Sequence, residues 1–314
     1  MRRILVDEKF HDSVNIFYTK FLEQLTAKPK NKLKNLKSVW DNSTCLGKYE
    51  SEYIQAIIDK YEEIVIAKPV EIIQLVQDFN LILHSTKISK EFHESITNAL
   101  RYTTLREKLL PFYQNIKLKS CVYCNAQLTI VIDREVDQSG RFELDHFYPK
   151  SQFPFLAASF YNLIPCCSNC NKAKLDKKTL FNLYTEEQSD LSVFGFILTD
   201  DSKDKYLLTK DHTDLIVKFI HLNGDNEMLE NHKSHFYIEE LYETQKDILE
   251  NLTTLSQVYN DDSKAELVDS FKELFPDKAM INRLIIGNYD SPEDIHLRPL
   301  AKFTQDIARE LKLI

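Results

Sequence analysis

Glycine and proline are scarce in this chain, with 5 Gly and 9 Pro in 314 residues. Folds rich in sheet use many turns with positive φ, which glycine adopts most readily, so this scarcity disfavours a protein built mainly of strands. The chain also lacks any stretch near the ~20 consecutive apolar residues of a membrane helix, and its first residues show no apolar secretion signal. We therefore expect a mostly helical, cytoplasmic protein with no membrane contact.

Acidic residues exceed basic ones, and the formal net charge is −8. Spread evenly, this charge would disfavour binding to nucleic acid. However, residues 115–180 contain nine Lys and Arg against six Asp and Glu, whereas the rest of the chain contains 31 against 42. The locally basic segment is the part suited to meeting phosphates.

Apolar residues recur at helical spacing from about residue 7 to 118, with breaks near Pro29 and Pro69. This pattern predicts a helical N-terminal region, residues 1–118. The lysine-rich run between Lys28 and Lys37 is interpreted as a solvated linker, with a phosphate-contacting arm as the alternative.

Residues 119–185 depart from helical spacing. Extended runs over 128–136 and 141–144, separated by turn-forming residues 138–140, predict a β-hairpin, and a helix is expected after Asn171. Residues 186–314 predict a mostly helical C-terminal region. Within it, FGFILTDD and KYLLT suggest a second hairpin, Gly287 ends one helix, and the last helix begins near Pro299. The expected fold class is mainly α, with a small α+β core between helical flanks.

Four of the six cysteines form two C-x-x-C pairs, Cys121 with Cys124 and Cys167 with Cys170. Two residues between thiols let both sulfurs reach one ion, and two such pairs complete a tetrahedral zinc site. A site with four thiolates has no open position for substrate, so we interpret this Zn²⁺ as structural. A redox pair or unrelated cysteines are the alternatives.

Between these pairs, Asp145 and His146 follow a predicted strand, and Asn162 and Asn171 come later. A carboxylate supplies a hard oxygen ligand, and an imidazole supplies a base near neutral pH. An Asp-His pair alone is a weak signal, but here polar side chains recur at points that the cysteines fix in space.

The series CVYC, LDHFYPKS and NLIPCCSNCNKAK resembles the zinc-containing HNH (ββα-metal) endonucleases over about residues 121–178. The resemblance implies that His146 is the general base, that Asp145 and Asn171 hold a catalytic Mg²⁺ or Mn²⁺, and that Asn162 braces the loop. Many members have histidine at the position of Asn171, and asparagine there favours hard ions.

The implied reaction is phosphodiester hydrolysis in DNA, or alternatively RNA. Five basic residues around the motif are expected to contact the nucleic-acid backbone: Lys150, Lys172, Lys174, Lys177 and Lys178. For the last four, on the expected helix after the site, a solvated helix face is the alternative.

The string DHFYPKS is also similar to the HNH subunits of Septu-type anti-phage systems, which act with an ATPase related to ABC and SMC proteins. That resemblance implies acidic flanks that dock the ATPase subunit. Two other functions remain open: a non-catalytic zinc module that binds nucleic acid or protein, and an assembly subunit whose partner carries the activity.

Overall fold

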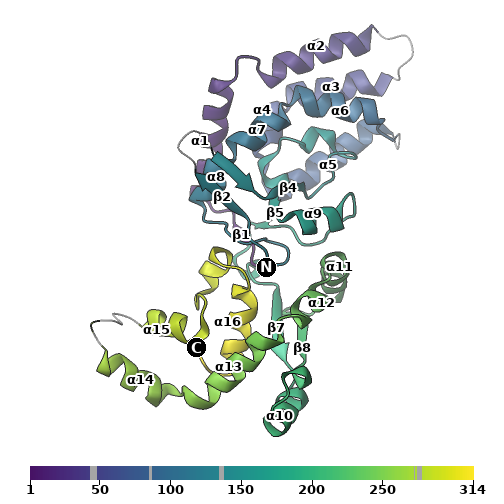
Figure 1. Ribbon diagram of the computed structural model, residues 1–314. Helices are drawn as coiled ribbons and strands as arrows, with labels where there is room; N and C mark the ends of the chain where they lie inside the picture. The colour runs from purple at the N-terminus through teal and green to yellow at the C-terminus, as the bar shows by residue number, and fades with distance from the viewer. Residues whose placement is uncertain (43–47, 85–86, 134–137, 272, 274–277) are drawn as a thin grey trace.

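The computed structural model describes residues 1–42, 48–84, 87–133, 138–271, 273 and 278–314 (Figure 1). Helices predominate, and the strands of the described residues form four two-stranded sheets. This confirms the mainly helical fold class with a small α+β core. Among the described helices, none combines the length and apolarity that crossing a bilayer requires.

The N-terminal region is helical, as predicted. Asp7 caps its first helix, because the carboxylate accepts a hydrogen bond from the Phe10 amide at 2.7 Å. Pro29 and Pro69 each begin a helix, where a missing amide hydrogen has no cost. The helices are α1 (Glu8–Gln24), α2 (Pro29–Asp41), α3 (Lys48–Asp59), α4 (Tyr61–Ile66), α5 (Pro69–Leu83), α6 (Lys90–Ala99), α7 (Tyr102–Lys108) and α8 (Leu110–Asn115).

The lysine-rich run belongs to α2, so its interpretation as a linker is wrong. Lys30 pairs with Glu62 of α4 at 2.6 Å. Pro29 sets the first turn of this helix, and Leu33 and Trp40 are buried.

The central part contains an antiparallel pair, β4 (Glu143–His146) and β5 (Leu163–Cys166), followed by α9 (Ser168–Lys174). The register sets His146 opposite Leu163. Two 3-10 turns, η1 (Pro154–Leu156) and η2 (Phe160–Asn162), connect the strands. These two strands and one short helix form the ββα unit.

The predicted hairpin exists, but its turn was misplaced. Strand β2 (Ile130–Asp133) pairs with β3 (Gln138–Arg141), so residues 138–140 lie in a strand, and the connection falls on 134–137, outside the described residues. The sequence suggested a turn at Gly140, yet a Cβ there would meet the Leu110 side chain at 2.6 Å. Gly140 therefore serves close packing rather than a turn.

The C-terminal region surrounds an antiparallel pair, β7 (Phe194–Leu198) and β8 (Val217–His221). FGFIL is a strand as predicted, but KYLLT lies in α10 (Asp200–Thr209), so the second strand of this hairpin was wrongly placed. The other elements are η3 (Gln188–Asp190), η4 (His212–Asp214), α11 (Asn226–Phe236), α12 (Ile238–Glu243), α13 (Lys246–Val258), α14 (Asp261–Ser270), α15 (Lys278–Ile286), η5 (Pro292–Leu297) and α16 (Ala301–Glu310).

Helix α16 closes the open edge of β7. Asp306 and Glu310 accept hydrogen bonds from the amides of Phe196 and Leu198 at 3.0 and 2.8 Å, which satisfies edge donors that would otherwise attract another strand. Gly287, with φ +67°, follows α15 as its predicted terminator.

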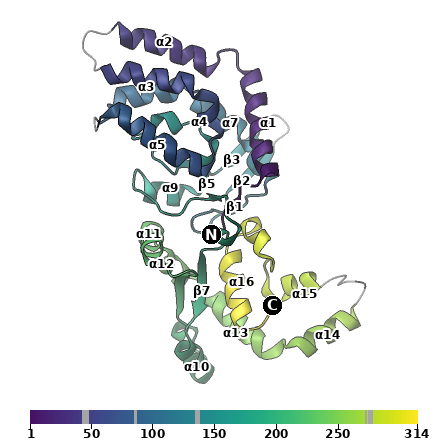
Figure 2. The same ribbon diagram turned by 180° about the vertical axis from the view of Figure 1, so that it is seen from behind.

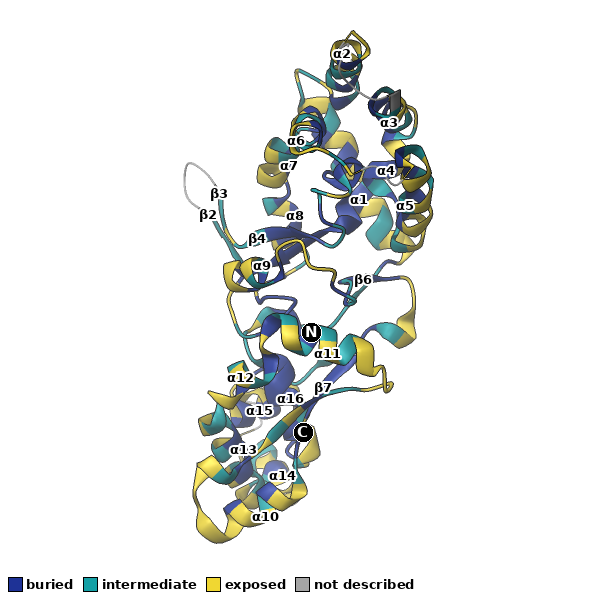
Figure 3. Ribbon diagram, turned by 90° about the vertical axis from the view of Figure 1, so that its right-hand side faces the viewer, coloured by how far each residue is buried: buried dark blue, intermediate teal, exposed yellow. Residues whose placement is uncertain are grey.

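The central part lies between the helical regions, as both sides of the molecule show (Figures 1 and 2). Strand β1 (Ile4–Leu5) pairs in parallel with β6 (Tyr184–Thr185), so the start of the chain lies beside the end of the ββα segment. Helices α10 and α14 lie at the end of the C-terminal region away from the central part, and many of their residues are exposed (Figure 3). The boundaries predicted at residues 118 and 185 stay a prediction.

Candidate active site

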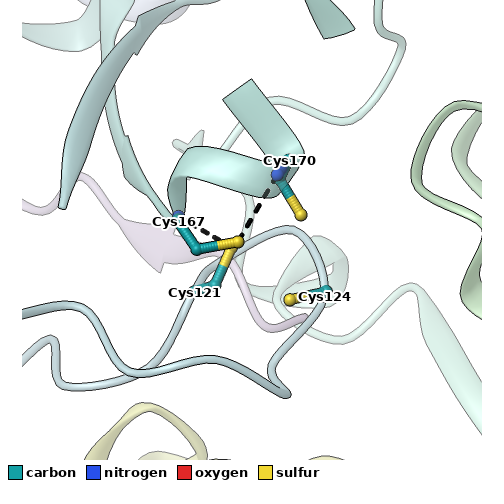
Figure 4. Close-up of side chains that lie close together, drawn as sticks. All are labelled: Cys121, Cys124, Cys167 and Cys170. Atoms are coloured by element: carbon teal, nitrogen blue, oxygen red, sulfur yellow. Dashed lines mark hydrogen bonds between the residues drawn. The ribbon is translucent and has the colours of Figure 1, made fainter. Parts of the chain in front are cut away.

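The four cysteines of the two C-x-x-C pairs converge as predicted (Figure 4). Their sulfur atoms all lie within 4.8 Å of one another, and all four residues are buried. Zinc bound at about 2.3 Å by four thiolates needs sulfur separations of about 3.8 Å, so the cluster fits a tetrahedral ion in donor type and spacing. Cys166 is also buried, but it lies in β5 opposite Glu143, outside the cluster.

Backbone amides of the cluster point at its sulfurs. Cys167 donates to Cys121 Sγ at 3.3 Å, and Cys170 donates to Cys167 Sγ at 3.4 Å. Hydrogen bonds with Cys121 and the other cluster thiols lower the pKa of Cys167 below its ordinary value, whereas burial raises the pKa of Cys121. Amide groups that donate to sulfur favour the thiolate, which is the form that binds metal.

Asp145 is buried between the cysteine knuckle and α9. Its Oδ2 accepts a hydrogen bond from the Tyr123 hydroxyl at 2.6 Å, and its Oδ1 pairs with Lys174 Nζ at 3.1 Å. Burial raises the pKa of Asp145, and the charge of Lys174 opposes that shift. Because Tyr123 stands between Cys121 and Cys124, the knuckle directly orients this carboxylate.

Lys174 does not lie on a solvated face, so its expected contact with a phosphate backbone is wrong. Its side chain is 0% exposed and also donates to the carbonyl of His146 at 2.8 Å. A buried carboxylate needs a charged or hydrogen-bonding partner, and Lys174 fills that need. This residue is therefore part of the core beneath the site.

His146 is 6% exposed, and its side chain points to the face of β4 opposite that of Asp145. Its Nε2 is 3.1 Å from the carbonyl of Ala157, which can only accept, so Nε2 carries the proton and Nδ1 keeps a free lone pair. The ring of Tyr102 lies 4.9 Å away. Burial first, and then the charge of Lys150, lower the pKa of His146 to about 3, so the imidazole is neutral at physiological pH.

Asn162 forms hydrogen bonds with the loop after β4. Its Oδ1 accepts from the Tyr148 amide at 2.7 Å, and its Nδ2 donates to the carbonyls of Tyr148 and Leu156 at 3.2 and 3.1 Å. The side chain is fully buried. Since His146 precedes this loop by one residue, Asn162 fixes the backbone beside the imidazole.

Asn171 faces Glu143, an acidic residue outside the predicted set of site residues. Its Nδ2 donates to Glu143 Oε2 at 3.4 Å, and Arg106 Nη2 lies 4.0 Å from the same oxygen. Glu143 is two residues before Asp145 on one strand, so strand alternation was a signal that could have found it. No local pattern points to Arg106, because α7 is distant in sequence.

The other lysines predicted to contact phosphate differ in how far they are exposed to solvent. Lys150 is partly buried, with its ammonium 4.9 Å from the centre of the Tyr102 ring. Lys172 is exposed on α9, and Lys177 and Lys178 are exposed after the helix. The helix expected to carry Lys177 and Lys178 as well as Lys172 ends at Lys174, because Leu175 has φ +48°.

The family model for HNH endonucleases matches residues 121–179. The matched segment contains the cysteine cluster and the ββα unit. The chain is similar to the Septu protein PtuB of Bacillus thuringiensis, with 28% identity over 148 residues. That alignment covers 46% of this chain and 50% of the relative, so the chain spans about half the length of the protein it matches. No solved structure matches the chain. The resemblances to HNH endonucleases and to Septu-type nuclease subunits are thereby confirmed, whereas the zinc stays a prediction.

Replacing Lys174 by Met should leave the Asp145 carboxylate buried without its cation. We expect a loss of about 3–5 kcal/mol in the free energy of unfolding, measured by chemical denaturation. Lys172→Met, on the exposed face of the same helix, serves as the control and should change stability by less than about 0.5 kcal/mol. Equal stability of the two variants would contradict the structural role of Lys174.

Proposed function

We propose that this protein is a metal-dependent HNH endonuclease that hydrolyses phosphodiester bonds of nucleic acid, with DNA as its substrate. The observation that carries the proposal is the HNH domain at 121–179, in which a neutral His146 neighbours Asp145 on a strand packed against α9. The exposed Lys172, Lys177 and Lys178 nearby suit a polyanionic substrate.

Asp145 and Asn171 are the residues proposed to hold Mg²⁺ or Mn²⁺. Carboxylate and amide oxygens are the donors that these hard ions prefer. Both Asp145 oxygens already have a partner, but a carboxylate has further lone pairs, so the donor set fits the ion. The bound ion would stabilise negative charge on the phosphoryl group and the departing oxygen.

His146 is proposed to take the proton from the attacking water. Its Nε2 is engaged by Ala157, which leaves Nδ1 as the basic nitrogen. Packing against Tyr102 and the hydrogen bond to Ala157 hold the ring in one orientation. Asn162 keeps the adjoining loop fixed, so the base is positioned before substrate arrives.

Plasmid cleavage with Mg²⁺ or Mn²⁺ tests this function. His146→Ala should lower the cleavage rate at least about 100-fold, because it removes the general base. His212→Ala, a half-exposed histidine of the C-terminal region, should cut like the wild type. Equal cutting by His146→Ala would remove this residue from the mechanism. No cutting by any protein, even with a partner ATPase, would favour a non-catalytic zinc module.

The cysteine cluster is proposed to hold one structural Zn²⁺. Metal analysis of the purified wild type should find one zinc per chain, and Cys170→Ser should lose it and melt at a lower temperature. Cys166→Ser is the matched control, because this neighbouring buried thiol lies outside the cluster and should keep the zinc. Loss of zinc from both variants, or from neither, would contradict the assignment.

Chelation of Mg²⁺ should stop cleavage without unfolding the protein.

We further propose a role in anti-phage defence together with an ABC- or SMC-like ATPase. This proposal is supported by the similarity to Septu protein PtuB and by the acidic regions outside the HNH domain. The ATPase encoded in the same operon should copurify with the tagged protein. Recovery of the nuclease alone, from cells that express both, would count against the partnership.

A further inference from the structure

One basic side chain at the candidate site comes from outside the HNH segment. Arg106 belongs to α7, which precedes residues 121–179. Its guanidinium lies 4.0 Å from Glu143 Oε2, the oxygen that also accepts a hydrogen bond from Asn171 at 3.4 Å. The three side chains form a continuous polar chain from α7 across β4 to α9.

The position of Arg106 is set by its neighbour one helical turn earlier. Tyr102 packs its ring 4.9 Å from that of His146 and donates its hydroxyl to the carbonyl of Leu144 at 3.4 Å. Residues four apart share one face of a helix, so Arg106 faces β4 together with Tyr102. Helix α7 therefore holds Tyr102 against the imidazole and, one turn later, Arg106 against Glu143.

Arg106 keeps hydrogen-bonding capacity for a further anion. Among the described residues, Glu143 is the one carboxylate within 4.0 Å of its guanidinium. That contact is long, and the two side chains are 47% and 41% exposed. A guanidinium has several N–H donors in a planar fork that matches phosphate oxygens.

A second cation lies close by without a carboxylate at contact distance among the described residues. Lys150 sits over the ring of Tyr102. Burial first, and then the charge of Arg106, lower the pKa of Lys150. An anion that binds near both cations would offset this effect and stabilise the protonated Lys150.

We propose that Arg106 binds the non-bridging oxygens of the scissile phosphodiester, while Glu143 acts as the positioning residue that aims its guanidinium. The inference rests on the proposed nuclease function. In the reaction, the water oxygen bonds to phosphorus, its proton passes to His146, and the phosphorus bond to the 3′ oxygen breaks. The leaving oxygen takes a proton from solvent. Arg106 stabilises the negative charge that builds on phosphorus oxygens during this exchange.

Cleavage kinetics of Arg106→Ala and Arg106→Lys test the inference, with Lys108→Ala as the matched control. Lys108 is an exposed basic residue of the same helix, beside α1. Arg106→Ala should lower kcat about 100-fold, and Arg106→Lys should recover part of the loss, because a lysine keeps the charge without the fork. Lys108→Ala should stay within about two-fold of the wild type. Glu143→Gln should lose less than Arg106→Ala, since the amide oxygen still accepts from the guanidinium.

Binding to duplex DNA as a function of salt supplies a readout that a structural role would not move. The slope of log affinity against log salt should fall by about 1 in Arg106→Ala, with an unchanged melting temperature. An Arg106→Ala protein that cuts and binds like Lys108→Ala would overturn this inference alone. A wild type that matches His146→Ala in cleavage would overturn the proposed function, and the inference with it.

Discussion

Helix α9 depends on four buried sulfur atoms that lie within 4.8 Å of one another. The helix has 7 residues, well below the ~12–15 that an isolated helix needs in water, so tertiary contacts must hold it. Cys167 and Cys170 hold its first turn, and Lys174 holds its end through Asp145. Asn171 lies between these two attachments, so its position depends on both.

The flanking regions hold the two halves of the site. The C-terminal region binds the cysteine knuckle, where His232 and Tyr242 donate to the carbonyls of Tyr123 and Cys124, each at 2.8 Å. The N-terminal helices bind the loop after β4, where Phe155 stacks on Phe79 with ring centres 3.9 Å apart. A ββα unit too small for a core of its own is thus stabilised from both sides.

The sequence predicted the elements whose signals are local. Each of these signals lies within a few residues of the chain. They are the spaced cysteines, the Asp-His pair, and the prolines Pro29 and Pro69. The buried position of Lys174 was not predictable in this way. A lysine on a short basic helix is expected to face solvent, and only the folded structure shows the buried Asp145 carboxylate that it pairs with. Arg106 was not predicted as a site residue for a related reason, because only folding brings α7 against β4. The turn near residue 139 was misplaced because Gly140 serves packing, and composition alone does not separate these roles.

The polar side chains of strand β4 differ in the face of the strand on which they lie and in how deeply they are buried. Glu143 and Asp145 share one face, and His146 lies on the other. Asp145, deeper in the strand, is enclosed by Tyr123 and Lys174, whereas Glu143 at the start of the strand stays partly exposed beside Asn171 and Arg106. Burial raises the pKa of Asp145, and Lys174 compensates with a fixed positive charge, so the deeper carboxylate is tied to the packing of α9. Glu143 instead contacts the partly exposed Arg106 and the side chain of Asn171, so this shallower carboxylate links α7 to α9.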